Sequence, residues 1–183
     1  MVDHIAAARG SLFRLRCRFL RRNVHIEKGL KLYRQLKIKG KGSCIIGKNC
    51  TIRGIPGSRN QYVTLYSNSP QATITIGDNA ELLAAKVSCK FAISIGHDVL
   101  IEEASLLDTD FHSMDRSRKA VEGETKESCM IVIGDRVSIG ARSIIAKGAR
   151  IGDESIVGPN SVVRGSYPRG SFIMGNPAKR VAQ

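Results

Sequence analysis

The chain has 183 residues, of which 42% are hydrophobic but only 5% aromatic, and it carries 18 glycines and no tryptophan. Its net charge of +13 at pH 7 favours anionic partners. There is no uninterrupted run of about 18 apolar residues, and the first residues lack a signal-peptide core, which excludes a membrane-spanning helix and a secretory signal. The five cysteines form no CxxC pair. Reduced, buried thiols in a cytoplasmic protein are therefore favoured over a disulfide or zinc framework.

Residues 1–25 are predicted to form a basic amphipathic helical segment. Large apolar residues alternate here with arginines, and these are Leu12, Phe13, Leu15, Phe19 and Leu20 beside Arg9, Arg14, Arg16, Arg18, Arg21 and Arg22. Two interpretations stay open: a helix that packs on the rest of the protein, or a helix that lies on an anionic membrane surface. Nucleic acid is not expected as a partner, because no binding motif accompanies the charge. His4 and His25 lie in or beside this segment, and neither is assigned a role.

A six-residue repeat dominates the remaining chain. Aliphatic residues recur at Ile133, Ile139, Ile145, Ile151, Val157 and Val163, and glycine follows four of them. The fourth residue after each is small or medium-sized. The same unit occurs upstream from Ile46, Ile76 and Ile95, and in looser form from Ile26. Neither a helix nor an alternating strand has this period. It predicts short strands joined by corners, with three units in each coil and a stacked aliphatic column inside.

This repeat, together with the ending "FIMGNPAKRV", resembles the hexapeptide-repeat acyltransferases. The resemblance implies an all-β fold, a left-handed parallel β-helix over residues 26–168, followed by a C-terminal tail at 169–183. It also implies a homotrimer that binds acetyl-CoA as co-substrate in a groove between adjacent prisms. The left-handedness rests on the resemblance alone, because crossovers in general are right-handed.

The repeat is interrupted once at length. The series Ile95, Ile101, Leu107 would need an aliphatic residue at position 113, which is serine, and the next clean unit begins at Ile133. Residues 108–131, called the excursion here, are charged and rich in hydroxyl groups, as expected of an exposed loop. Long loops on a rigid scaffold often carry function.

The excursion contains His112, one of only four histidines. The acyltransferase resemblance implies that this histidine is catalytic, as a general base that takes the proton of an attacking hydroxyl. A nearby carboxylate would orient the imidazole, and Asp110 is preferred over Asp108. His97, on an outward position of the repeat, is interpreted as a surface histidine in preference to a binding residue. No metal is expected, because a zinc site needs three converging ligands and no third histidine accompanies His97 and His112.

The resemblance also implies the residues that bind acetyl-CoA. The backbone of Ala141, in "SIGAR", would stabilise the oxyanion and, with Pro159, line the pantetheine arm. Pro159 has no N–H, so only its carbonyl can take part. The cations Arg164, Lys179 and Arg180 would bind the phosphates. Ser138 departs from the family, whose members often have an aromatic residue there.

Three functions stay open. The "DTDFHSMD" loop favours O-acetylation of a saccharide acceptor, in a bacterial surface polysaccharide (capsule, O-antigen or exopolysaccharide) or its precursor. The second function is N-acetylation of a nucleotide-linked amino sugar, although the short basic leader cannot supply the nucleotide-binding domain of many such relatives. The third is a non-catalytic β-helix scaffold, which would not need His112. Localisation is expected in the cytoplasm, peripheral at the inner face of the membrane.

Overall fold

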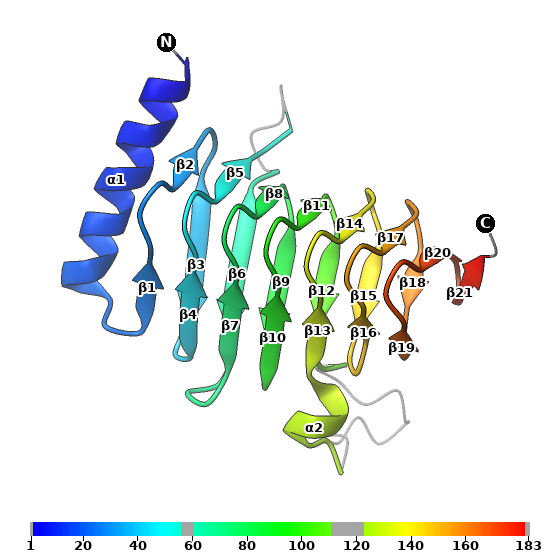
Figure 1. Ribbon diagram of the computed structural model, residues 1–183. Helices are drawn as coiled ribbons and strands as arrows, with labels where there is room; N and C mark the ends of the chain where they lie inside the picture. The colour runs from blue at the N-terminus through cyan, green and yellow to red at the C-terminus, as the bar shows by residue number, and fades with distance from the viewer. Residues whose placement is uncertain (1, 56–60, 111–122, 182–183) are drawn as a thin grey trace.

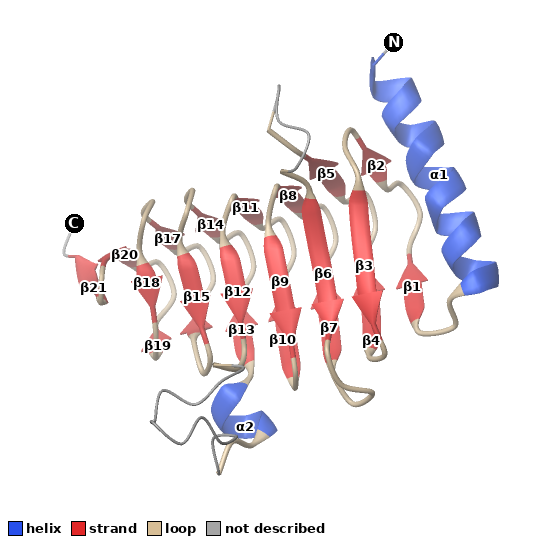
Figure 2. Cartoon of the chain, turned by 180° about the vertical axis from the view of Figure 1, so that it is seen from behind, coloured by secondary structure: helices blue, strands red, loops and turns tan. Residues whose placement is uncertain are grey.

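The chain forms a prism of three sheets with a helix at its N-terminal end (Figures 1 and 2). The computed structural model describes residues 2–55, 61–110 and 123–181. Its helices are α1 (Val2–Leu20) and α2 (Lys126–Cys129). Sheet A contains β1 (Val24–Ile26), β4 (Ser43–Ile46), β7 (Thr73–Ile76), β10 (Ala92–Ile95), β13 (Ile131–Ile133), β16 (Arg150–Ile151) and β19 (Ser166–Tyr167). Sheet B contains β2 (Lys31–Leu32), β5 (Thr51–Arg53), β8 (Glu81–Leu83), β11 (Leu100–Glu102), β14 (Ser138–Ile139), β17 (Ile156–Val157), β20 (Phe172–Gly175) and β21 (Ala178–Val181). Sheet C contains β3 (Leu36–Gly40), β6 (Val63–Ser67), β9 (Lys86–Cys89), β12 (Ser105–Leu107), β15 (Ile144–Ala146) and β18 (Val162–Val163).

Successive strands visit sheets A, B and C in turn, so that each coil of three strands stacks on the coil before it. All pairs along the stack are parallel, and only the last pair, β20 with β21, is antiparallel. The predicted coil of three repeat units is therefore confirmed. The parallel stack also continues beyond Pro168, because β20 pairs with β17.

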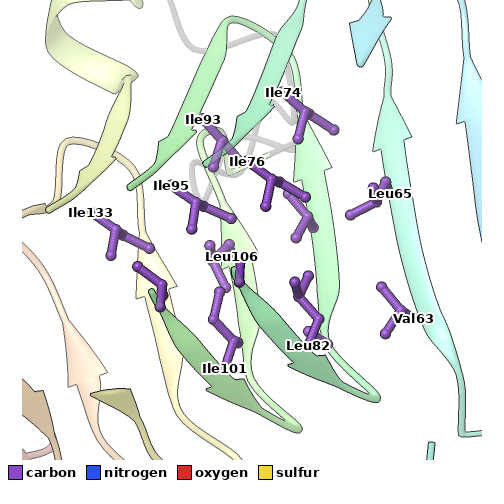
Figure 3. Packing of buried hydrophobic residues seen from close by; sticks show 14 of the residues in the cluster. Val63, Leu65, Ile74, Ile76, Leu82, Ile93, Ile95, Ile101, Leu106 and Ile133 are labelled. Carbon is purple, nitrogen blue, oxygen red and sulfur yellow. The ribbon is translucent and has the colours of Figure 1, made fainter. Parts of the chain in front are cut away.

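Identical positions of consecutive coils pair in register and form a continuous aliphatic column (Figure 3). In sheet A, Ile46, Ile76, Ile95 and Ile133 follow one another in this way, and each is at most 2% exposed. The small residues of the repeat also point inward: Val137, Ser143, Ala149, Ser155 and Ser161 are all buried. Burial of one aliphatic side chain contributes roughly 1.5–3 kcal/mol, so the column is the main source of stability.

The glycines that follow the aliphatic residues of the repeat do not form the tight corners themselves. The left-handed conformation belongs to the residue two positions later, as at Asn79 (φ 58°) and Asp98 (φ 55°). A Cβ at Gly77 would lie 2.5 Å from the backbone of Gly96 in the next coil. The glycines are therefore needed for the close approach of stacked coils.

One register prediction is wrong. Leu106 rather than Leu107 is the inward residue of β12, with 0% exposure, and it pairs with Ile145. The preceding corner is one residue shorter than the corner before β15. Its left-handed residue is Glu103, two positions after Ile101, whereas Arg142 stands three positions after Ile139. A strict six-residue count therefore overshoots by one.

A second interruption was missed. β5 ends at Arg53 and β6 begins at Val63, whereas only two residues separate β8 from β9. Residues 56–60 of this connection lie outside the described residues. The sequence "GIPGSRN" contains the glycine, proline and serine signals of a loop, which could have revealed it.

Helix α1 closes the N-terminal end of the column, which confirms the predicted helix. Ala6 and Cys17 are buried against the first coil, and a Cβ at Gly10 would lie 1.8 Å from the Leu30 carbonyl oxygen. The Arg14 side chain donates to the Ile26 carbonyl at 2.9 Å. All five cysteines are free and buried, as predicted. Within the described ranges, no helix is long and apolar enough to cross a membrane.

Candidate active site

The excursion leaves the prism at the corner where sheet C gives way to sheet A, after β12 and before β13 (Figure 1). His112, the predicted general base, lies outside the described residues. What the structure does place is the base of the excursion: Asp108, Thr109 and Asp110 on the outgoing side, and residues 123–130 on the return.

Asp108 lies in the wall of the prism. Its side chain is 0% exposed and occupies the inward position after Leu106. One carboxylate oxygen accepts the Lys90 N–H at 2.7 Å, and the other accepts the Phe91 N–H at 2.7 Å and the Cys89 thiol at 3.3 Å. Two backbone N–H groups balance the cost of burying this carboxylate. Both carboxylate oxygens of Asp108, the second candidate partner of His112, are thus engaged by residues 89–91 at the corner of the preceding coil.

Asp110, the first candidate partner, is paired with Lys147 at 2.7 Å, from Nζ to Oδ2. The same Nζ lies 2.9 Å from Glu124 Oε1, and Lys90 Nζ lies 3.0 Å from Glu124 Oε2. Thr109 Oγ1 donates to Glu124 Oε2 at 3.2 Å. We call these residues the base cluster. Its members come from both ends of the excursion and from two coils of the prism, so the cluster ties the excursion to the scaffold.

The electrostatics of the base cluster favour the charged forms. Burial opposes ionisation of Glu124, whose side chain is 6% exposed, but hydrogen bonds and charges from Lys147 and Lys90 outweigh burial and keep the pKa of Glu124 below its usual value. Hydrogen bonds to Asp110 and Glu124 raise the pKa of Lys147. Sequence reasoning missed Glu124, Lys90 and Lys147, because nothing in the linear order links positions 90, 124 and 147.

The return side of the excursion has its own support. α2 is capped by Thr125, whose hydroxyl accepts the Ser128 N–H while the Ser128 hydroxyl accepts the Thr125 N–H. The Gly148 N–H donates to the Cys129 carbonyl at 2.9 Å, which attaches α2 to the corner after β15. Two independent attachments therefore fix the return, one through Gly148 and one through Glu124.

The candidate acetyl-CoA residues fall on two different edges of the prism. Ala141 and Pro159 occupy equivalent corners of consecutive coils, between sheets B and C, and the Asn160 N–H donates to the Ala141 carbonyl at 2.9 Å. Lys179 and Arg180 lie on β21, paired with Met174 and Ile173 at the end of sheet B. Arg164 follows β18, on the sheet C to sheet A edge that also carries Lys147. The structure brings Ala141 and Pro159 together and separates both from the excursion by the width of sheet C.

His97 belongs to a ladder of corner residues between sheets A and B. The Asp78 N–H donates to His97 Nδ1 at 2.9 Å, and the His97 N–H donates to Asp135 Oδ1 at 2.8 Å. In the next coil the Asp135 N–H donates to Asp153 Oδ1. His97 thus takes the place that aspartate takes in neighbouring coils. In the part of the chain that the structure describes, no group of three or more His, Cys, Asp or Glu could hold a metal ion.

The fold and the repeat define a parallel β-helix built from hexapeptide units. Residues 130–165 match the family model "Bacterial transferase hexapeptide (six repeats)". The chain is 36% identical over 95 residues to the "Putative lipopolysaccharide biosynthesis O-acetyl transferase WbbJ" of Escherichia coli, covering 48% of each chain. It is 41% identical over 49 residues to the "Putative acetyltransferase YvoF" of Bacillus subtilis, covering 27% of this chain and 28% of that one. The chain thus spans less than half the length of these curated relatives.

Solved structures share the fold. The polySia specific acetyltransferase NeuO superposes with a TM-score of 0.67 at 24% identity, over 87% of this chain and 67% of that one. A mutant of AntD, an N-acyltransferase from Bacillus cereus in complex with dTDP and coenzyme A, superposes with a TM-score of 0.65 at 20% identity, over 86% and 82% of the two chains. The resemblance to hexapeptide-repeat acyltransferases is confirmed in sequence and in fold.

Proposed function

We propose that the protein is an acetyl-CoA-dependent O-acetyltransferase of the left-handed β-helix type. It would transfer the acetyl group to a hydroxyl of a saccharide in a bacterial surface polysaccharide or its precursor. Two features support this function: the local similarity to WbbJ, and an excursion with His112 whose base is held to the prism by charged side chains at 2.7–3.0 Å. A scaffold would have no use for this arrangement, in which the Glu124 carboxylate is buried, because burying an ionised group is costly.

His112 would act as general base. A sugar hydroxyl is too weak an acid to attack a thioester unaided, and a neutral imidazole within hydrogen-bond reach can accept its proton as the new ester bond forms. The proton then passes to the departing thiolate of coenzyme A. Asp110 would orient the imidazole while Lys147 holds Asp110, and the Ala141 N–H would stabilise the oxyanion. Asp108 would have a structural role, in which its carboxylate stabilises the corner of the preceding coil of the prism.

The active site would lie between subunits of a homotrimer. The base of the excursion and the Ala141–Pro159 corners stand on opposite edges of sheet C within one chain. Side-by-side packing of prisms joins the excursion edge of one subunit to the Ala141 edge of the next. Arg164 on the first edge, and Lys179 and Arg180 near the second, would bind the phosphates of acetyl-CoA. Light scattering should give the mass of a trimer, and a monomer would contradict this arrangement.

The second candidate is N-acetylation of a nucleotide-linked amino sugar, which the fold shared with AntD favours. The two functions differ in the bond that they make. The product of the reaction with acetyl-CoA should lose its acetyl group in hydroxylamine if it is an ester and keep it if it is an amide. Mass spectrometry of the acceptor before and after hydroxylamine treatment distinguishes them.

Release of the coenzyme A thiol measures turnover directly. The protein's own thiols should react slowly, because burial raises the pKa of Cys44 to about 12 and of Cys50 to about 11. His112→Ala should lower kcat by roughly 10²- to 10⁴-fold. His25→Ala is the matched control, since His25 is exposed and lies in β1 at the far end of the prism. Full activity of His112→Ala on the true acceptor would refute the assignment of His112 as general base. If neither wild type nor His112→Ala releases coenzyme A with any saccharide or amine acceptor, the scaffold function would be favoured.

The protein is proposed to work in the cytoplasm, near membrane-linked glycan precursors.

A further inference from the structure

Helix α1 has a second apolar face that no other part of the described chain covers. Ile5, Leu12, Leu15 and Phe19 are 48%, 69%, 52% and 74% exposed. At 3.6 residues per turn they align on one side of the helix, and we call them the outer stripe. The opposite side, with Ala6, Gly10 and Cys17, packs on the first coil. Figures 1 and 2 show α1 as the outermost element at this end, so the outer stripe faces away from the prism.

Cations border the outer stripe on both sides. Arg9 and Arg16 lie along one edge and Arg18 along the other, and each is exposed. The only acidic residue of α1 is Asp3, whose carboxylate accepts the Tyr33 hydroxyl and is thus turned toward the prism. Near the C-terminal end of α1, four arginines line a pocket together with residues of β1; the lining residues are Arg14, Arg18, Arg21, Arg22, Val24, His25 and Ile26. Apolar side chains between cations are typical of a helix that lies in the interface of an anionic bilayer.

We infer that α1 docks the protein on an anionic phospholipid surface through the outer stripe. A second copy of α1 is the competing occupant, because the spacing of the stripe also suits a coiled coil. In such a pair the positions that flank the seam would be Arg9, Arg16 and Arg18, so cations would face cations from both helices. A bilayer that carries negative headgroups offers the opposite charge, which decides between the two occupants.

Docking sets the orientation of the whole molecule. α1 lies across the end of the prism, so the column of coils points away from the bilayer. Sheet A runs from β1 through β4, β7 and β10 to β13, and four strand spacings amount to about 19 Å. If the proposed acetyltransferase function holds, the base of the excursion stands farther than this from the lipid, because α1 lies between β1 and the bilayer and a helix is about 10 Å across. This consequence, which rests on the proposed function, favours lipid-linked saccharides long enough to reach it.

Co-sedimentation of the full chain with vesicles tests docking without any need for activity. One set of vesicles is phosphatidylcholine, and the other contains equal parts of phosphatidylcholine and phosphatidylglycerol. We expect binding to the second set that weakens as salt is raised. Arg9→Gln/Arg16→Gln should lower the partition coefficient about 30-fold, since each cation contributes about 1 kcal/mol, which is a factor of about five. Leu12→Gln/Phe19→Gln should lower it at least about 10-fold, because two side chains no longer insert.

The control is Lys86→Gln/Arg136→Gln, which removes the same charge from exposed positions on the coils and should leave most of the binding intact. Because the Leu12 and Phe19 side chains are largely exposed, the melting temperature of Leu12→Gln/Phe19→Gln should match that of wild type. The inference is overturned if wild type does not sediment with the anionic vesicles, or if the control loses as much binding as Arg9→Gln/Arg16→Gln. It is also overturned if Leu12→Gln/Phe19→Gln reduces the oligomer size, because a second copy would then cover the stripe.

Discussion

Asp108→Asn separates a structural carboxylate from a catalytic one. The carboxylate accepts two backbone N–H groups, from Lys90 and Phe91, at 2.7 Å each. Asparagine keeps one acceptor oxygen and places an NH₂ group where the other stood, so one buried N–H loses its partner and faces a donor. Hydrogen bonds to charged groups contribute about 1.5–3 kcal/mol, and an unsatisfied buried donor adds its desolvation cost, so we expect a loss of about 2–4 kcal/mol.

Thermal unfolding is the measurement. For a chain of this size, each kcal/mol lowers Tm by about 2–4 °C, so Asp108→Asn should unfold about 4–16 °C below wild type. Asp98→Asn is the matched control. It removes the same charge from an exposed corner residue whose carboxylate accepts the Asn79 side-chain amide at 2.9 Å, and its stability should change by less than about 0.5 kcal/mol.

Turnover provides the contrast. Assayed well below its Tm, Asp108→Asn should retain most of the wild-type kcat, because the side chain is fully buried and its oxygens are engaged by the wall. A variant with unchanged Tm and a kcat reduced as far as that of His112→Ala would refute this reasoning. Asp108 would then act in the chemistry rather than in the prism.

Three further predictions concern other contacts. Lys147→Met should destabilise by about 1–3 kcal/mol and lower kcat, whereas Lys147→Arg should retain both, as calorimetry and turnover would show. Because the pKa of Glu124 is lowered in the folded state, its contribution to stability is present above its unfolded pKa and is lost as pH falls through the folded value. Lys147→Met removes the largest cause of this lowering, so the Tm of the variant should fall less than that of wild type over the same acid range. His97→Asp should leave Tm unchanged, since neighbouring coils carry aspartate at the same corner, and a large decrease would contradict the ladder. Gly10→Val should detach α1, because a Cβ meets the Leu30 carbonyl at 1.8 Å, and trypsin should then cleave α1 faster than in wild type.

The aliphatic column could be predicted from the sequence because residues separated by a fixed period occupy equivalent positions on the sheets of the prism. Each coil repeats the last, so Ile133, Ile139 and Ile145 must fall on three successive faces, and no distant contact has to be known. The prediction went wrong at Leu107, where one corner is a residue shorter. Corner length depends on the left-handed residue, Glu103 in one coil and Arg142 in another, and neither side chain has a strong intrinsic preference for that conformation.

The base cluster could not be predicted, because it joins residues that the period does not relate. Asp110 and Glu124 lie on the excursion, where the six-residue repeat is interrupted and predicts no positions, and Lys147 lies in a later coil. They meet only because β12 pairs with β15, which places the corner after Ala146 beside the corner after Leu107. The repeat does indicate why these residues can lie close together, since the strands of one sheet in a parallel stack all end at the same edge of the prism. Charged residues that follow β12 and β15 therefore collect on the edge from which the excursion leaves, and this edge is where Lys147 can hold Asp110 and Glu124 at once.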